Sequence, residues 1–214
     1  MSKTTENATT ENDVTMRQTE TKGFGIRQIT MIGMLSAVSI ILFYLNFSVP
    51  FMPGFIKMDI SDLPALIGSF SLGPVAGVVI CLIKNLIGLL KTTTGGVGEL
   101  SNFILSASFV LCAGIVYKLK KNRKGALIGS ILGAIFMAVI SVFSNYYFVY
   151  PVYTMFMPMD AIIAAYQAIN PNIQNLWQAL IMFNMPFTFI KAMFSVAITF
   201  LIYKNISPII KGNR

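Results

Sequence analysis

The polar residues that could take part in chemistry stand at the ends of long apolar runs. Glu99 follows the glycine-rich segment 95–98 and opens a predicted helix, and Asn102 lies one turn further on the same face. The helix dipole stabilises a carboxylate at this position, and the carboxylate can accept hydrogen bonds from N–H or O–H groups of a ligand. These residues predict part of a binding site for a polar organic molecule. The alternative is an ordinary N-terminal acid with no ligand.

A second candidate group lies in the last apolar run. Asn184, Thr188 and Lys191 are spaced at i, i+4 and i+7, so they share one helix face. Pro186 is expected in the first turn of the deeply inserted part, which places Lys191 about one and a half turns below the outer boundary. An ionisable side chain at that depth predicts a functional site, with Glu99 as its partner when no ligand is bound. The alternative is a lysine that reaches back to the interface.

A third group comes from the end of the fifth apolar run and from the first outer loop. Asn145 precedes Tyr146 in a tyrosine-rich segment, where an amide could pair with the edge of a heterocycle and aromatic rings could stack on it. Tyrosines at a helix end also form the aromatic belt at a membrane surface. The loop 51–57 combines proline, glycine and large apolar residues such as Phe55, as expected of a gate that packs on a ligand. A plain hairpin is the alternative.

The absence of certain residue types and motifs excludes several kinds of chemistry. There are no histidines, which excludes His-based triads and the HExxH zinc motif. No GxxxxGK[ST] motif is present, so any ATP hydrolysis must come from another chain. Cys81 and Cys112 lie inside apolar runs without a CxxC motif, and we interpret them as small buried residues. Lys84, inside another apolar run, is not assigned to a site. We therefore predict neither an enzyme, nor a metal site, nor a resident cofactor.

The composition predicts that membrane helices position the candidate residues. Of the 214 residues 55% are hydrophobic and only 11% are charged, with a mean hydropathy of +0.72, which excludes an ordinary soluble domain. Residues 1–22 are polar and lack the features of a secretory signal. We expect a disordered cytoplasmic tail at 1–25, a membrane domain at 26–205 and a cytoplasmic tail at 206–214.

The distribution of lysine and arginine predicts the number of helices. The stretch 61–90 is compatible with one kinked helix or with two helices separated at Gly73-Pro74. Only two helices place all three basic clusters, including the one at 118–124, on the cytoplasmic side. We therefore predict an all-α integral membrane protein with six transmembrane helices and both termini cytoplasmic.

The second of these helices, at about 62–72, is too short to cross a hydrocarbon core of about 30 Å alone. Short helices that end at membrane depth are tolerated where protein encloses them or where they line a cavity. This predicts a pocket near the outer face. The outer segment 151–183 contains an amphipathic stretch at 160–169 that could lie over the pocket, and a connecting loop is the alternative.

Small residues recur at helical spacing in two of the predicted helices, which allows close approach of helix backbones in a membrane. For the fifth helix we expect packing within the protein. For the first helix, internal packing and contact with a partner subunit are equally open. The residues are Gly33 and Ala37 in the first helix and Gly125, Gly129 and Gly133 in the fifth.

Several motifs resemble those of the substrate-binding S components of energy-coupling-factor (ECF) vitamin transporters, in particular the riboflavin-specific ones. The likeness covers about residues 29–203. The motifs are KMDISDLPALIG at 57–68, GPVAG at 73–77, IKNL at 83–86, Glu99 with Asn102, Asn145-Tyr146 with the tyrosine-proline run, and Pro186-Phe187 with Lys191.

The resemblance implies a multi-pass protein of the bacterial cell membrane that binds riboflavin with high affinity from outside and closes the first outer loop over it. It implies docking on a membrane-embedded coupling subunit driven by two cytoplasmic ATPase subunits. Glu99, Asn145 and Lys191 match the flavin-contacting residues of the family. Gly33 and Ala37 match its contact with the coupling subunit.

One position departs from the family pattern. After Pro-Phe, where an asparagine is expected, the chain has Thr188, and Asn184 on the same face could compensate. The preference between riboflavin and its phosphorylated forms, such as FMN, is therefore open. An S component for another vitamin, and an ion-coupled secondary transporter that uses Lys191 and Glu99 as a relay, are the alternatives. The predicted ligand-binding residues are Glu99, Asn145, Lys191, Thr188, Asn184, Asn102, Phe55, Lys57, Asp59 and Tyr146.

Overall fold

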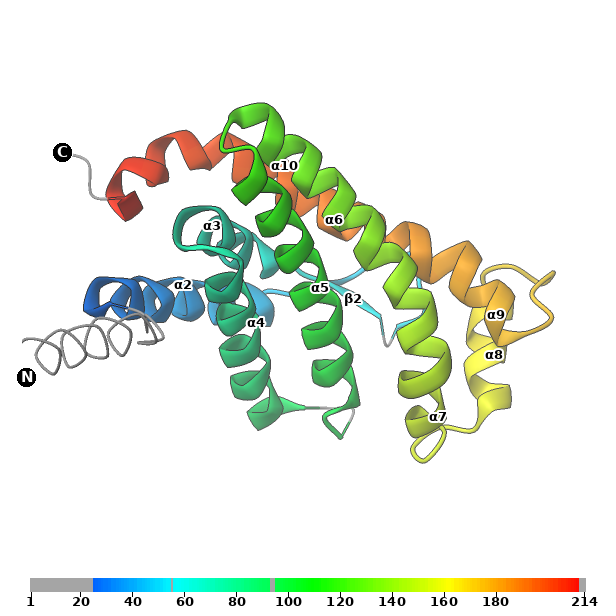
Figure 1. The fold of residues 1–214 in the computed structure, drawn as a ribbon. Helices are drawn as coiled ribbons and strands as arrows, with labels where there is room; N and C mark the ends of the chain where they lie inside the picture. The colour runs from blue at the N-terminus through cyan, green and yellow to red at the C-terminus, as the bar shows by residue number, and fades with distance from the viewer. Residues whose placement is uncertain (1–24, 55, 93–94, 212–214) are drawn as a thin grey trace, which may run out of the picture.

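The computed structural model describes residues 25–54, 56–92 and 95–211, with side chains up to residue 202. The predicted N-terminal tail up to residue 24 and Phe55 of the predicted gate lie outside the described residues. Most of the described chain is helical (Figure 1). The elements are α2 (Ile26–Tyr44), β1 (Phe47–Ser48), β2 (Lys57–Met58), α3 (Asp62–Leu72), α4 (Pro74–Gly88), η1 (Leu89–Lys91), α5 (Val97–Leu119), α6 (Arg123–Ser144), η2 (Asn145–Val149), α7 (Tyr150–Tyr153), α8 (Met159–Gln167), α9 (Leu176–Ala179), η3 (Leu180–Asn184) and α10 (Met185–Lys211).

Five helical segments are long and apolar enough to cross a membrane, and α3 is a shorter apolar helix. Together they correspond to the six predicted helices, whereas the number of complete crossings and the side of each terminus stay predictions. The last segment begins at Leu176, and its helix continues into the predicted tail as far as Lys211. The five segments are Ile26–Tyr44, Pro74–Lys91, Val97–Leu119, Arg123–Tyr153 and Leu176–Ile202.

The break between α3 and α4 arises from two residues. Gly73 has a φ of 112°, which residues with a side chain rarely adopt, and Pro74 takes the first position of α4, where its missing N–H costs no hydrogen bond. The predicted separation into two helices is confirmed. Nine of the eleven residues of α3 are buried, because α2, α4, α5 and α10 all pack against it. The short length of α3 predicts that other parts of the protein enclose it, and this prediction is confirmed.

The fifth predicted helix, α6, packs closely on α5. A Cβ added to Gly129 would lie 2.7 Å from the carbonyl oxygen of Ala113, and one added to Gly133 would lie 2.8 Å from that of Phe109. The absence of side chains at these glycines therefore allows the two backbones to approach, and the expected internal packing of this helix is confirmed. The main core lies between these helices and α3, α4 and α10, and it includes Leu66, Ile80, Phe109, Val110, Met137 and Val196.

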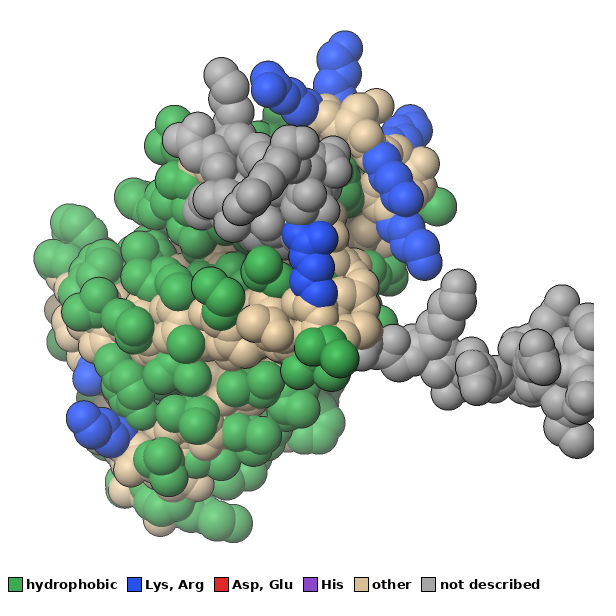
Figure 2. All heavy atoms as spheres, turned by 90° about the vertical axis from the view of Figure 1, so that its left-hand side faces the viewer, with side chains coloured by type: hydrophobic (Ala, Val, Ile, Leu, Met, Phe, Trp, Pro, Cys, Tyr) green, Lys and Arg blue, Asp and Glu red, His purple; other side chains and the backbone are tan. Residues whose placement is uncertain are grey.

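The surface is largely apolar on the face shown in Figure 2, with many of the lysine and arginine side chains at its upper right and others at its lower left. The exposed basic residues of segment 118–124 lie on the turn between α5 and α6. Gly33 and Ala37 are exposed on α2, and a Cβ added to Gly33 would meet no atom within 4 Å. In the described part of the chain, the face of α2 that carries Gly33 and Ala37 is therefore exposed.

Two helices contain a π-helical turn just before a proline. η2 lies between α6 and Pro151, and η3 lies between α9 and Pro186. A proline has no N–H to donate to the carbonyl four residues earlier, and a wider turn is one way in which a helix accommodates this loss. Each π-helical turn carries one asparagine, Asn145 in η2 and Asn184 in η3, and both are buried.

The region that is predicted to lie on the outer side, here called the outer region, consists of a hairpin and a helical cap. β1 and β2 pair antiparallel, with Phe47 opposite Met58. The segment after α7 forms α8, as the amphipathic pattern predicts, and α8 packs in a second apolar cluster that also contacts Ile56 of the hairpin. The buried residues of this cluster include Tyr150, Ile162, Tyr166, Ile173 and Leu180.

Candidate functional site

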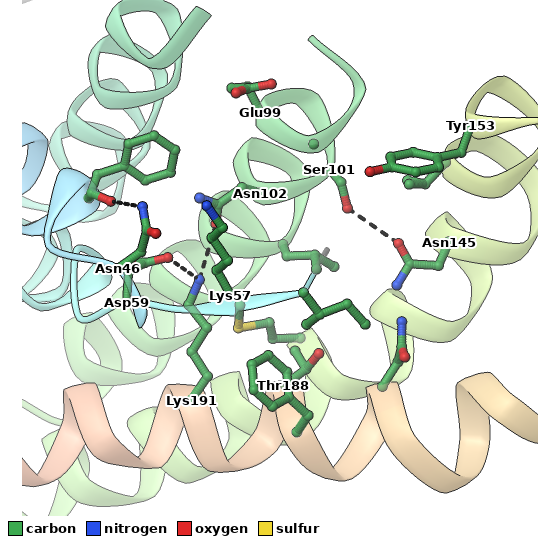
Figure 3. A pocket seen from close by; sticks show the side chains of 18 of the residues that line it. Asn46, Lys57, Asp59, Glu99, Ser101, Asn102, Asn145, Tyr153, Thr188 and Lys191 are labelled. Carbon is green, nitrogen blue, oxygen red and sulfur yellow. Dashed lines mark hydrogen bonds and ion pairs between the residues drawn. The ribbon is translucent and has the colours of Figure 1, made fainter. Parts of the chain in front are cut away.

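A cavity of about 500 Å³ lies between the outer hairpin, the first turns of α5, the π-helical turn η2 and the start of α10 (Figure 3). Its volume is in the range of pockets that enclose a small organic molecule. Most of the predicted ligand-binding residues line it, although they come from segments that are distant in sequence. These residues are Lys57, Asp59, Glu99, Asn102, Asn145, Asn184, Thr188 and Lys191.

Lys191 forms an ion pair inside the cavity wall. Its Nζ lies 2.8 Å from Oδ2 of Asp59 and 3.5 Å from Oδ1 of Asn102. Lys191 is 7% exposed and Asp59 is 4% exposed. The prediction that Glu99 is the partner of Lys191 is therefore wrong. The segment between β2 and α3 carries Asp59 to the face of α10, whereas Glu99 lies at the outer end of α5 (Figure 3).

Glu99 is held by the loop that precedes α5. Thr92 donates a hydrogen bond of 2.8 Å to Oε2 of Glu99 and accepts one of 2.9 Å from the N–H of Gly96. Glu99 is buried, with 9% exposure, and it lines the cavity. Its position in the first turn of α5 agrees with the prediction from the sequence. The carboxylate is therefore a fixed negative group that can accept hydrogen bonds from a ligand.

Asn145 lies at the first position of η2, where α6 widens. The hydroxyl of Ser101 on α5 donates a hydrogen bond of 3.3 Å to Oδ1 of Asn145. The amide nitrogen of Asn145 points away from Ser101 (Figure 3). Because Asn145 lines the cavity, this nitrogen is available to donate to a bound molecule.

The predicted shared face of the last helix is confirmed, since Asn184, Thr188 and Lys191 all line the cavity. Thr188 is 6% exposed and stands one turn from Lys191. Lys57, at the start of β2, reaches the same cavity from the hairpin. The proposed gate therefore contributes at least this residue and Ile56 to the wall.

Tyr146 does not line the cavity, which corrects its place in the predicted site. It is 38% exposed and packs edge-on against Tyr147 and Trp177, with ring centroids 5.1 Å apart in both pairs. Consecutive residues of a helix point in different directions, so the inward position of Asn145 turns its neighbour outward. Tyr146 therefore belongs with the aromatic side chains on the outside of the helix, which was the alternative interpretation.

A second ion pair is linked to the cavity wall by hydrogen bonds and was missed from the sequence. Lys84 of α4 and Asp62 of α3 are both 0% exposed, with Nζ 2.8 Å from Oδ1. Lys84 also donates to the hydroxyl of Ser61 at 2.9 Å, and that hydroxyl donates to Oδ1 of Asp59. Ser61 thus joins the buried pair to the carboxylate that pairs with Lys191. A lysine inside an apolar run was the available signal, but its partner could not be read from the sequence.

The remaining lining residues were also not predicted. They add aromatic rings, hydroxyls and one more cation at the ends of several elements, where the sequence gives no pattern that separates pocket residues from interfacial ones. Within the described residues no group of three or more His, Cys, Asp and Glu side chains could hold a metal ion. These additional residues include Phe43, Tyr44, Asn46, Lys91, Ser101, Tyr150, Tyr153 and Phe187.

The combination of groups is suited to recognition of a polar organic molecule. Lys57, Lys91 and Lys191 supply donors, Glu99 supplies an acceptor, and Asn145 supplies an amide. Aromatic side chains in the same wall can stack on a flat ring. The cavity therefore has the groups needed to bind and orient a molecule that carries both an aromatic ring and several hydrogen-bonding atoms.

Comparisons with known proteins agree with this geometry. The family model "ECF transporter, substrate-specific component" matches residues 27–203. A riboflavin transporter named RibU from Staphylococcus aureus (strain TCH60) is 31% identical over 185 residues, which cover 86% of this chain and 93% of that protein. A riboflavin transporter named FmnP from Bacillus subtilis (strain 168) is 29% identical over 192 residues, which cover 88% and 96% of the two chains.

A solved structure of the S component of a bacterial ECF transporter superposes with a TM-score of 0.68 and 30% sequence identity. The match covers 86% of this chain and 97% of the solved one. The family model spans most of the helical region described above, and its members are substrate-binding membrane subunits rather than enzymes. The chain therefore belongs to the substrate-specific S components of ECF transporters.

Proposed function

We propose that this protein is the high-affinity riboflavin-binding S component of an ECF transporter in a bacterial cell membrane. The observation that carries the proposal is the convergence of Glu99, Asn145 and Lys191 on one cavity of about 500 Å³. These are the residues that the resemblance to riboflavin-specific S components assigns to the flavin. The naming of the relatives RibU and FmnP as riboflavin transporters supports the same ligand.

The chemistry of riboflavin suits the groups in the cavity wall. Its ring system is flat and aromatic, with carbonyl and imino acceptors and one N–H donor along an edge, and its ribityl chain carries hydroxyls. Asn145 can donate to ring acceptors, Glu99 can accept from N–H or O–H groups, and the aromatic residues Tyr44 and Phe187 of the wall can pack on the ring. Riboflavin is here a transported substrate and not a resident cofactor. Whether FMN also binds depends on how the lysines meet its phosphate.

Energy for uptake would come from partner subunits. We propose that the exposed face of α2 with Gly33 and Ala37 docks on a membrane-embedded coupling subunit, which two cytoplasmic ATPase subunits drive. Small residues on an exposed helix face allow another helix to approach closely, and neighbouring large apolar residues such as Met34 and Ile41, which are 59% and 61% exposed, would be covered by it.

The visible absorption spectrum of detergent-purified protein, followed by a riboflavin titration, tests the ligand. We expect a flavin spectrum in near-stoichiometric amount, or saturable quenching of the single tryptophan, Trp177. A protein that ignores flavins but binds another vitamin would keep the S-component family and overturn the substrate. Uptake by liposomes that contain only this protein and an imposed ion gradient would overturn the need for an ATPase module.

A further inference from the structure

Tyr166 is a buried side chain of the outer cap that does not line the cavity. It lies on α8 and is 0% exposed, and it packs in the same apolar cluster as Ile162, one turn earlier. Its hydroxyl nevertheless reaches two residues of the cavity wall, Tyr150 and Asn184. A tyrosine hydroxyl in an apolar cluster needs a hydrogen-bonding partner, and here its partners are parts of the binding site.

The three residues form a ring of two short hydrogen bonds and one long one. Oη of Tyr166 lies 2.6 Å from Oδ1 of Asn184 and 2.5 Å from Oη of Tyr150, and Nδ2 of Asn184 lies 3.5 Å from Oη of Tyr150. Burial raises the pKa of Tyr166, so its hydroxyl keeps its proton. An amide oxygen can only accept, so Tyr166 donates to Asn184. The hydroxyl of Tyr150 then donates to Tyr166, because each hydroxyl has one proton.

This ring fixes the orientation of the Asn184 amide. Its oxygen accepts the hydrogen bond of Tyr166. The amide nitrogen is therefore the atom of Asn184 that can donate to a molecule in the cavity. The bond to Tyr150 at 3.5 Å is too long to hold that nitrogen firmly. Asn145 shows the same arrangement, since Ser101 donates to its oxygen. The part of the wall formed by the two π-helical turns therefore presents two amide nitrogens as donors.

We propose that Tyr166 is a positioning residue that sets the specificity of the site: it holds the Asn184 amide so that this wall takes hydrogen-bond acceptors of the ligand, such as carbonyl or imino groups. The ligand class rests on the proposed riboflavin function, but the orientation of the amide does not. Asn184 thereby supplies a hydrogen-bond donor with a fixed direction. Thr188 cannot replace it, because its single hydroxyl can rotate. A donor on the ligand at this place would face a donor of the wall and be rejected.

A double-mutant cycle on riboflavin affinity tests the role of Tyr166. Tyr166→Phe removes only the hydroxyl, and we expect the Kd to rise about 3- to 10-fold, as for the loss of one neutral hydrogen bond. Asn184→Leu should raise the Kd by a similar factor. In the Asn184→Leu background, Tyr166→Phe should leave the Kd unchanged within twofold. An equal effect of Tyr166→Phe in both backgrounds would show that Tyr166 acts on the fold and not through Asn184, and would overturn the proposal.

Two controls separate positioning from general damage to the cap. Ile162→Val removes one methylene from the same buried face of α8, and it should leave the Kd unchanged. Asn184→Asp keeps an acceptor for Tyr166 but removes the donor toward the ligand, so we expect at least a tenfold rise in Kd. A variant Asn184→Asp that binds riboflavin as tightly as the unmodified protein would contradict the assigned orientation.

A measurement without ligand keeps this test independent of the proposed function. In protein with 13C-labelled asparagine side chains, the infrared amide band of Asn184 is identified by its loss in Asn184→Leu. Tyr166→Phe should move this band to higher frequency, because the carbonyl loses its donor, and Ile162→Val should not move it. A band that stays in place in Tyr166→Phe would overturn the proposal. If the band moves but the unmodified protein binds no riboflavin, the positioning role stands and the proposed function fails.

Discussion

Charged residues in the cavity wall are held in place by other residues of the protein. Lys191 pairs with Asp59, and Thr92 anchors Glu99. Fixed polar groups bind a complementary molecule without first losing side-chain freedom. The same residues exclude poor ligands, since a buried charge that loses its partner is costly. Affinity and selectivity therefore depend on the side chains that line the cavity and also on the residues that hold these side chains in place.

Replacing Glu99 by leucine should weaken riboflavin binding. The change removes a charge-assisted hydrogen bond, which contributes about 1.5 to 3 kcal/mol, so we expect the Kd to rise roughly 10- to 150-fold. Asp160→Leu is the matched control, because Asp160 is an exposed acid on α8 outside the cavity wall. Titration of the purified variants with riboflavin measures both effects. Unchanged affinity in Glu99→Leu would remove this carboxylate from the ligand contacts.

Breaking the buried pair of Lys84 and Asp62 should destabilise the protein. Lys84→Met leaves the carboxylate of Asp62 uncompensated at 0% exposure, which costs about 3 to 5 kcal/mol. Adding Asp62→Leu should restore most of the lost stability, because a buried pair can be replaced by apolar side chains. Thermal unfolding in detergent, followed by the fluorescence of Trp177, gives the order of the unmodified protein, the single variant and the double variant. A double variant less stable than Lys84→Met would contradict this account.

The helices differ in which of their faces are covered. α3 is enclosed by four other helices, and α6 lies against α5 through its glycines, whereas most of α2 faces outward. The π-helical turns of the last two long segments bring Asn145 and Asn184 to the cavity. A helix end with an irregular backbone can be tolerated at membrane depth where it lines such a cavity. The elements thus position the site through their breaks as much as through their regular turns.

The two kinds of small-residue row should respond differently to the same change. Gly133→Ala places a methyl group 2.8 Å from the carbonyl oxygen of Phe109, and such overpacking costs about 1 to 3 kcal/mol. Gly33→Ala meets no atom within 4 Å and should stabilise α2 by up to about 1 kcal/mol through its helix propensity. Unfolding temperatures of the two variants in detergent check the comparison. Equal stability would show that the close approach of α5 and α6 can relax at no cost.

At the scale of the whole molecule, the ligand site and the main basic turn lie at opposite ends of α5. The helix begins beside Glu99 and ends near Lys118, and its 23 residues span about 34 Å, close to the thickness of a bilayer core. The cavity at one end, the basic turn at the other and the uncovered face of α2 between them are the arrangement expected of a subunit that captures a molecule on one side and docks laterally on a partner.

Enlarging Ala37 should block assembly and leave ligand binding intact. Ala37→Trp fills the groove between small residues, so a partner helix can no longer approach, whereas the cavity lies elsewhere. Leu132→Trp is the control, because Leu132 is exposed on α6, a helix outside the proposed docking face. Co-purification with the coupling module and ATP-dependent uptake in proteoliposomes measure docking, and a riboflavin titration measures binding. Normal assembly of Ala37→Trp would place the docking surface on another face.

The sequence by itself determined the helical membrane architecture, the break at Gly73-Pro74 and eight of the residues that line the cavity. These features depend on local properties, namely hydropathy, backbone preference and spacing along one helix, which a linear pattern contains. The shared face of Asn184, Thr188 and Lys191 is of this kind. The rare polar residues of an apolar chain are also conspicuous, because burying them in a membrane without a role is costly.

Only the tertiary structure decided which residues meet. Lys191 pairs with Asp59 across 132 positions, Lys84 is neutralised by Asp62, and Tyr146 turns outward beside an inward-facing Asn145. Such contacts depend on how helices pack and rotate relative to one another, and these angles are fixed by side chains from several elements at once. The periodicity of a single helix carries no information about these angles. The partners of the ionisable residues could therefore not be predicted from the sequence pattern.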